Sequence, residues 1–163
     1  MTSRRSRGPT PTLATAVARA VEAHFPEWVK LGADPDRGSH GDPDAPVLVY
    51  RIPSPTCPGH VLGLVIRGNT VEITYHDGVA PGPAERLYAV PAGEEEEAAA
   101  AVVADLRRIV AGEVVVTVEP LGRVTRTLRR DGVRHLLRFE ERGGLPPVGG
   151  EGLTVYVWSS PGD

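Results

Sequence analysis

The clearest pattern along the chain is the alternation of apolar and polar positions on either side of Gly68-Asn69. Residues 61–67 and 70–76 both alternate in the way expected of a β-strand with one buried face. A two-residue turn containing glycine tolerates positive φ and joins antiparallel strands. Pairing the strands across this turn gathers the large apolar residues on one face: Leu62, Leu64, Ile66, Val71, Ile73 and Tyr75. A shift by one residue would mix the two faces, so the pattern predicts the register as well as the hairpin.

Two other segments have the spacing of an amphipathic helix. The first covers residues 11–25, opens with a Thr-Pro pair at 10–11 and ends before Pro26, because proline disfavours helical geometry in the residue that precedes it. The second covers residues 94–111, and its glutamate-rich start suits the positive end of the helix dipole. Gly112 follows it, where a glycine cap belongs. The apolar stripe of this second helix consists of Val102, Leu106, Ile109 and Val110.

The rest of the chain is predicted to be mainly β. Short apolar runs between turn residues predict strands at 47–52, 86–90, 114–118 and 153–158. A second hairpin is predicted from residues 123–130 and 133–140, joined by Asp-Gly at 131–132. Successive hairpins around one long helix indicate an α+β fold, with a mainly antiparallel, twisted sheet against which both helices pack. We expect a single domain over residues 10–163, preceded by a disordered basic tail at 1–9.

Composition narrows the class of protein. The chain has 163 residues, of which 40% are hydrophobic and 24% charged, as in globular domains. A net charge of −3 gives the whole molecule no field that would attract nucleic acid or a membrane, and no apolar run is long enough to span a bilayer. The single cysteine, Cys57, excludes an intrachain disulfide and favours a reducing cytoplasm. The excess of arginine over lysine, with many alanines, glycines and prolines, is typical of a GC-rich bacterial genome.

The second predicted hairpin is unusually rich in arginine. Across its turn, one outward face would carry Arg123, Arg129, Arg134 and Arg138, with Arg129 directly opposite Arg134. Like charges that face each other across a sheet destabilise it unless an anion lies nearby. Two interpretations remain open: a solvated face neutralised by neighbouring glutamates, or a docking patch for a protein with an acidic surface. Nucleic acid fits less well, because this face has no aromatic residue on which a base could stack.

Signatures of catalysis and metal binding are weak. The sequence lacks the G-x-S-x-G, P-loop and H-E-x-x-H motifs. Glu72, His76 and Asp77 could form an acid–base group, although a strand that ends at an Asp-Gly turn explains them equally well. The aspartates of loop 32–46 have the ligand type for a cation, but prolines stiffen the loop. Cys57 lies in a turn with no evident base. We therefore expect no metal ion and no cofactor.

Parts of the chain resemble small bacterial α+β families that are grouped with the immunity proteins of polymorphic toxin systems. The similar features are a hairpin that ends in Val-Glu-Ile-Thr-Tyr-His-Asp at 71–77 and a helix that ends in L-x-x-I-x-x-G at 106–112. A strand follows that helix at once, and Trp158 lies near the C-terminus. The resemblance implies a cytoplasmic protein that binds another protein and performs no chemistry. It assigns no binding residue.

These observations favour a non-catalytic, immunity-like binding module whose partner is a protein with an acidic surface. The alternative is a small-molecule-binding domain or a hydrolase-like enzyme. That alternative requires a cavity between the sheet and the long helix, with Glu72 and His76 close to it. The sequence favours the binding module because the motifs on which catalysis would rest are missing.

Overall fold

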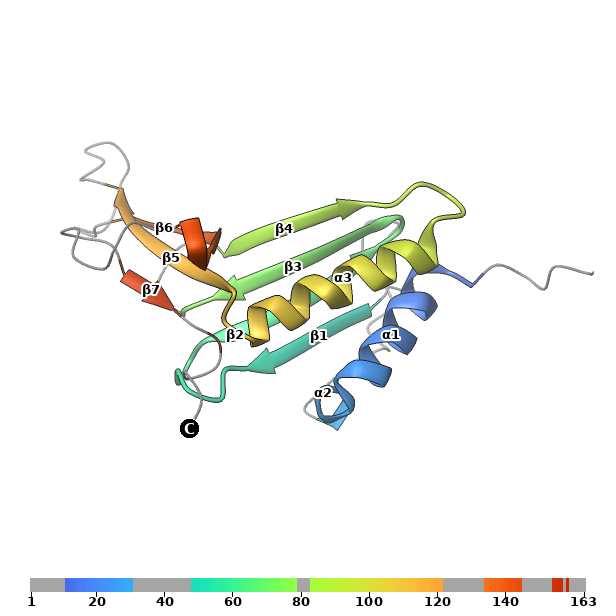
Figure 1. Ribbon diagram of the computed structural model, residues 1–163, viewed down its shortest axis with the longest axis horizontal. Helices are drawn as coiled ribbons and strands as arrows, with labels where there is room; N and C mark the ends of the chain where they lie inside the picture. The colour runs from blue at the N-terminus through green and yellow to red at the C-terminus, as the bar shows by residue number, and fades with distance from the viewer. Residues whose placement is uncertain are drawn as a thin grey trace, which may run out of the picture.

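The computed structural model in Figure 1 describes residues 11–30, 48–78, 83–121, 134–144, 154–156 and 158. Its helices are α1 (Leu13–His24), α2 (Pro26–Lys30), α3 (Glu95–Val110) and the short 3₁₀ helix η1 (Arg142–Gly144). Its strands are β1 (Leu48–Pro53), β2 (Val61–Arg67), β3 (Thr70–His76), β4 (Ala84–Ala89), β5 (Val114–Leu121), β6 (Arg134–Glu141) and β7 (Thr154–Tyr156). The predicted α+β class is confirmed.

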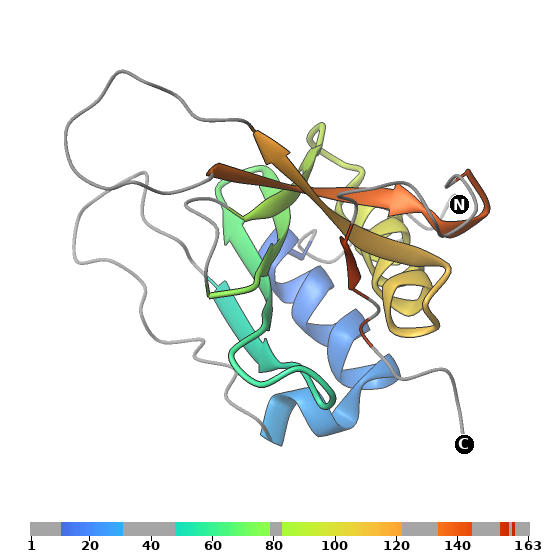
Figure 2. The ribbon, with the colours of Figure 1, turned by 90° about the vertical axis from the view of Figure 1, so that its left-hand side faces the viewer.

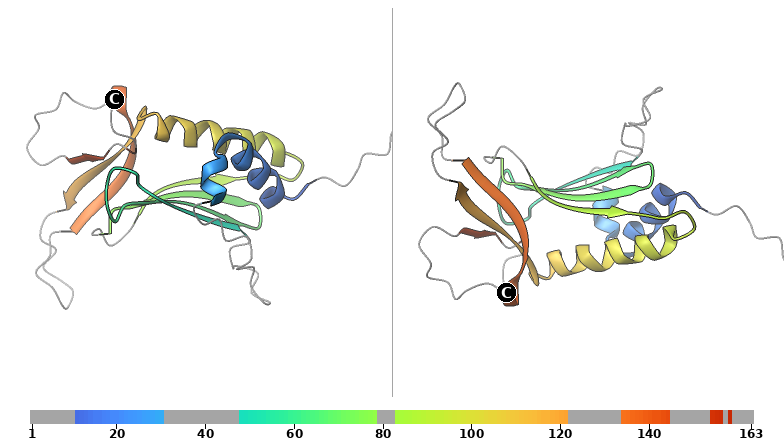
Figure 3. Two further views of the ribbon diagram at one scale, coloured as in Figure 1. Left: turned by 90° about the horizontal axis from the view of Figure 1, so that it is seen from below. Right: turned by 90° about the horizontal axis from the view of Figure 1, so that it is seen from above.

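The strands form two antiparallel sheets. The larger has the order β1-β2-β3-β4, and the smaller has the order β6-β5-β7. Helices α1 and α3 lie side by side on one face of the larger sheet, while the smaller sheet lies beyond the C-terminal end of α3 (Figures 2 and 3). No described helix covers the other face of the larger sheet. We call that uncovered side the open face.

The hairpin of β2 and β3 has the predicted register. Leu62 faces Tyr75, Leu64 faces Ile73 and Ile66 faces Val71 across the two strands. All six side chains are buried on the side of the helices. The turn is formed by Gly68, with φ 53°, and Asn69.

The core between the helices and the larger sheet is closely filled. Helix α3 contributes Val102, Leu106 and Ile109, and α1 contributes Val17 and Val21, all at most 2% exposed. The stripe predicted for α3 is confirmed, except that Val110 is only partly buried. The same apolar cluster continues through β5 into the smaller sheet and includes the indole of Trp158. Both sheets therefore share one core.

The ends of α1 differ in detail from the prediction. The helix starts two residues later than the Thr-Pro pair at 10–11 suggested: the hydroxyl of Thr12 caps it by accepting a 3.3 Å hydrogen bond from the backbone N of Thr15. Helix α1 ends before Pro26, as predicted, but Pro26 then starts the unpredicted helix α2. Phe25 and Trp28 stack there with ring centroids 4.0 Å apart, which anchors the short helix on the core.

The end of α3 confirms the predicted glycine cap. The backbone N of Glu113 donates to the carbonyl of Arg108 at 2.9 Å, and that of Gly112 donates to Ile109 at 3.1 Å. This pair of bonds is the Schellman motif, which needs a left-handed residue, and Gly112 has φ 73°. The chain turns sharply here, so β5 follows α3 with almost no loop.

The predicted second hairpin is wrong in its pairing. Strand β6 pairs with β5, from Leu121 opposite Arg134 to Val114 opposite Glu141. The prediction had given the place of β5 to residues 123–130. Residues 122–133, which include the predicted turn, lie outside the described residues. The predicted strand at 114–118 is confirmed as the buried first part of β5, and β5 is the partner of β6 that local turn signals did not reveal.

Candidate functional site

The open face carries a shallow groove of about 280 Å³ across β1, β2 and β3, which we call the sheet groove. Its apolar walls are Val49, Val61 and Val65, all on the side of the sheet opposite the helices. These valines are the outward half of the alternation that buries Leu62 and Leu64. The same period-two pattern that builds the core therefore also lines the groove.

The floor of the sheet groove is formed by a glycine. Gly63 faces Thr74 across β2 and β3, and a Cβ atom at position 63 would collide with the Thr74 hydroxyl. Both residues are buried although they lie on the open face. Glycine thus lets the threonine lean across the neighbouring strand, and the centre of the groove stays low.

Three basic side chains line the sheet groove. They are Arg51, Arg67 and His76, each of which is exposed. Neither arginine forms an ion pair with a described residue, whereas Arg19 and Arg86 both do. The groove therefore presents guanidinium groups that the described part of the protein does not neutralise.

A row of outward-facing residues extends from the groove to the edge of the sheet. Val49, Val65, Glu72 and Leu87 lie side by side on successive strands. Leu87 is 68% exposed and is the one large hydrophobic side chain exposed among the described residues. Glu72 separates Leu87 from the valines of the groove, so Leu87 is a single exposed apolar side chain at the sheet edge, which is ordinary on a protein surface.

The residues predicted as an acid–base group do not converge. Glu72 and His76 share the outward face of β3, but four residues of strand separate them by about 13 Å. Asp77 is buried just beyond the end of that strand. Of the three, only His76 lines the sheet groove. Glu72 and His76 are therefore too far apart for direct proton transfer between them.

The predicted arginine patch is not assembled by the described residues. Arg138 is exposed on β6 and lies opposite Thr117 of β5. The backbone of Arg134 pairs with Leu121, so the register that placed it opposite Arg129 is replaced. Arg123 and Arg129 lie outside the described residues, as does the 32–46 loop that was weighed as a cation site.

Cys57 belongs to a compact turn. The hydroxyl of Ser54 accepts hydrogen bonds from the backbone N of Cys57 at 3.1 Å and of Thr56 at 3.3 Å. The hydroxyl of Thr56 donates to the carbonyl of Trp158 at 3.2 Å, which ties the turn to the C-terminal segment. Cys57 itself is partly exposed. Its place in this turn is explained by backbone hydrogen bonding.

A histidine–tyrosine pair that the sequence did not reveal lies beside this turn. His60 Nδ1 and the Tyr75 hydroxyl are 2.7 Å apart, and the His60 ring meets Tyr156 edge-on at 4.5 Å. Burial, followed by the nearby Cys57, raises the pKa of the Tyr75 hydroxyl. Tyr75 therefore stays protonated at neutral pH and is able to donate to the histidine. Together with Trp158, these rings join the larger sheet to β7.

A second unpredicted cluster surrounds the buried Asp105 of α3. Its carboxylate accepts hydrogen bonds from Arg86 and from the Tyr88 hydroxyl, both on β4. Arg86 also lies 3.9 Å from a carboxylate oxygen of Glu141 and 5.6 Å from the ring centre of Phe139, both on β6. Burial and the bond to Asp105 raise the pKa of Tyr88. The cluster connects α3, β4 and β6, which is a structural role.

Comparison with known proteins identifies no relative. No family model, curated protein or solved structure matches this chain. Within the described ranges, no three histidine, cysteine, aspartate or glutamate side chains gather as metal ligands. None of the described helices is long and apolar enough to cross a membrane. The sheet groove, with its unneutralised arginines, is therefore the candidate functional site.

Proposed function

We propose that this protein is a non-catalytic binding module whose sheet groove receives an acidic segment of a partner protein. The observation that carries the proposal is the lining of the groove: Arg51 and Arg67 lack ion-pair partners among the described residues, and none of the described lining residues is a carboxylate. A planar guanidinium group binds carboxylates through two parallel hydrogen bonds. An acidic partner would supply the missing counter-charge.

The spacing of the groove residues limits the form of the partner segment. Arg51 lies opposite Gly63 on β2, and Arg67 lies four residues further along that strand. The two arginines are therefore about 14 Å apart, given the rise along a strand and the spacing between strands. An extended segment reaches that distance with acidic residues four positions apart. The valines between the arginines would contact an apolar residue midway between those two acids, which is the one intervening residue on the same face of an extended segment.

The alternative function, an enzyme or small-molecule site between sheet and helix, has less support. The described residues fill that space with buried side chains, among them Leu64, Ile73 and Leu106. Glu72 and His76, which the alternative requires near a cavity, lie on the open face instead. The resemblance to immunity proteins supports a protein partner, and under this proposal that partner would be a toxin with an acidic contact surface.

A synthetic probe tests the groove before the partner is known. The extended peptide Glu-Thr-Val-Thr-Glu has acids at the required spacing and a valine between them on the same face, and Lys-Thr-Val-Thr-Lys is its charge-reversed counterpart. We expect the acidic peptide to shift the backbone amide signals of β1 and β2 in NMR spectra of the labelled protein, and the basic peptide to leave them unchanged. Equal shifts with both peptides, or shifts confined to the helices, would contradict the proposal.

The natural partner provides the second test. The wild-type chain is used to capture it from native cells, and the purified partner is then measured against Arg51→Glu/Arg67→Glu. We expect association at low salt to slow by about tenfold or more and its salt dependence to flatten, because salt screens such steering. The matched control is Arg138→Glu/Arg142→Glu, which changes the charge equally at exposed positions outside the groove. If the control slows association and the groove variant does not, the partner binds near the arginine patch predicted from sequence.

A further inference from the structure

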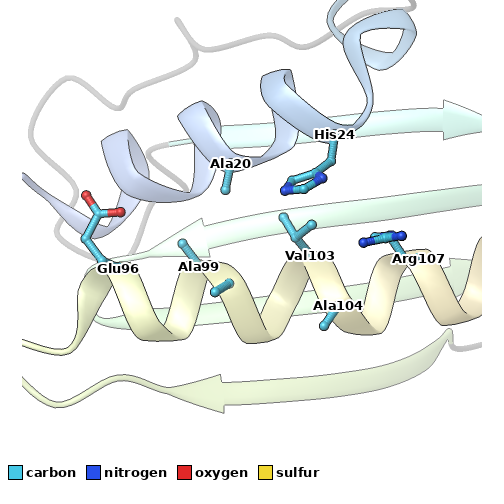
Figure 4. Close-up of a pocket in the computed structure, with 8 residues that line it drawn as sticks. Ala20, His24, Glu96, Ala99, Val103, Ala104 and Arg107 are labelled. Atoms are coloured by element: carbon cyan, nitrogen blue, oxygen red, sulfur yellow. The ribbon is translucent and has the colours of Figure 1, made fainter.

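A second groove, of about 230 Å³, lies between α1 and α3 on the side away from the sheet (Figure 4). We call it the helix groove. Ala20 and His24 line it from α1, and six residues line it from α3: Glu96, Ala99, Ala100, Val103, Ala104 and Arg107. Glu96 lies at one end of the groove, and Arg107 and His24 lie at the other. Glu96 therefore places a carboxylate at one end of the groove, and Arg107 places a guanidinium group at the other.

The lining of α3 is symmetric in position and complementary in charge. The six positions are arranged evenly about the midpoint between residues 101 and 102, so that each has a mirror position: Glu96 with Arg107, Ala99 with Ala104, and Ala100 with Val103. A second α3 that packed antiparallel about a two-fold axis at this midpoint would bring each residue to its mirror position. Acid would then meet base at both ends. In the middle, Ala99 and Val103 are already buried within one copy, so the contact would be made by the exposed side chains of Ala100 and Ala104.

We infer that the helix groove is the interface between two copies of this chain, packed through antiparallel α3 helices. A two-fold interface is self-complementary by definition, since residue i contacts residue j and j contacts i. The arrangement of α3 meets that condition through its charge. A parallel arrangement would instead oppose glutamate to glutamate and arginine to arginine, which is unfavourable.

Glu96 and Arg107 are both accessible for ion pairs with a second copy of the chain. Arg107 is exposed and has no ion-pair partner among the residues that the structure describes. Glu96 accepts a 3.0 Å bond from Arg19, but its side chain is still 60% exposed, so it retains room for a second donor. The two charged ends are about 16 Å apart along the helix. Alanines between them allow helix axes to approach to the short end of the usual 8–10 Å range.

This interface is independent of the proposed binding function, because the sheet groove lies on the opposite side of the larger sheet. A dimer of this kind would leave both sheet grooves uncovered. It would present two copies of the arginine-lined surface to partners. The failure of either proposal would therefore not decide the other.

Sedimentation equilibrium of the full chain, from low micromolar to submillimolar concentration, tests the inference. We expect a reversible monomer–dimer equilibrium. Arg107→Glu and Glu96→Arg should each raise the dimer dissociation constant by about tenfold or more, because each places two like-charge contacts in a symmetric dimer. The variant Arg19→Glu/Glu96→Arg/Arg107→Glu should restore dimerisation, since it reverses all three charges and so keeps both the Arg19–Glu96 pair within the chain and the pairing across the interface.

Two neighbouring alanines provide the steric test and its control. Ala100→Gln adds a longer side chain to the lining and should weaken the dimer, while Ala101→Gln adds the same side chain to an exposed position outside the groove and should not. A chain that stays monomeric at every concentration would overturn the inference and leave the groove to another occupant. So would a dimer that is indifferent to Arg107→Glu and Ala100→Gln, or a correctly folded triple variant Arg19→Glu/Glu96→Arg/Arg107→Glu that remains monomeric.

Discussion

Removing the carboxylate of Asp105 should destabilise the fold more than its size suggests. Asp105 is 8% exposed and accepts hydrogen bonds from Arg86 and Tyr88, which lie on a different element. Asp105→Ala leaves a partly buried guanidinium group and a phenol without their acceptor. An unpaired, partly buried charge lowers the stability of the folded state strongly, because water does not solvate it fully.

The magnitude follows from how far Arg86 is withdrawn from water. Breaking a buried ion pair by removing one partner costs about 3–5 kcal/mol. The Arg86 side chain is still 26% exposed, with Glu141 at 3.9 Å as a second anion and the Phe139 ring beneath it. We therefore expect a loss near the lower end, about 3 kcal/mol, which is a large part of a typical domain's stability. Asp105→Asn keeps one acceptor oxygen and should lose about half as much.

Urea unfolding followed by tryptophan fluorescence measures this loss, because Trp28 and Trp158 are both buried in the folded protein. The control replaces both charges, Arg86→Leu/Asp105→Leu, and should be within about 1 kcal/mol of the wild type, since exchanging a buried pair for apolar residues is often neutral. A loss below about 1 kcal/mol for Asp105→Ala would show that Arg86 is solvated without it. A double variant as unstable as Asp105→Ala would show that packing, and not charge, is lost.

Two further stability measurements test other parts of the fold. Leu106→Ala should lower the free energy of unfolding by about 2–5 kcal/mol, because the side chain is fully buried between α3 and the sheet; a change under half a kcal/mol, by about that same scale, would show that α3 is not docked there. Tyr75 has a pKa raised above its ordinary 10.0, so the folded state holds the phenolic proton more tightly than the unfolded state does. That stabilisation is complete below pH 10.0 and is lost as pH rises through the folded pKa, so Tyr75→Phe should show a smaller decline in stability above pH 10.0 than the wild type. Equal alkaline slopes for the two proteins in urea titrations would contradict this explanation.

Local signals in the sequence were sufficient where the interacting residues are close along the chain. The hairpin at 61–76 was predicted with its register, because a glycine turn and the alternation of apolar residues act on the same few residues. The cap at Gly112 was predicted for the same reason. The hairpin predicted around residues 131–132 failed because β6 had a competing partner, β5, whose buried valines gave no indication of which strand they would join.

The candidate sites depend on contacts that no local pattern contains. Asp105 occupies a helix position that reads as solvent-facing, and it is buried only because β4 supplies two donors to it. The lining of the sheet groove was visible in the alternation, as the outward set that includes Val61 and Val65. That this face has no helix over it is a property of the whole fold. Without knowledge of that open face, the sequence favoured the arginine-rich residues 123–142 as the binding surface.

The order of the strands has a consequence for how the chain folds. Each strand of the larger sheet pairs with the strand next to it in sequence, so β1 to β4 close only short loops as they assemble. Helix α1 is different, because its ion pair from Arg19 to Glu96 spans 77 residues. Loop-closure entropy and contact order both place such remote contacts late in folding. Until α1 docks, α3 would rest on the meander with its flank open to solvent, and self-association through the helix groove would belong to the fully folded chain alone.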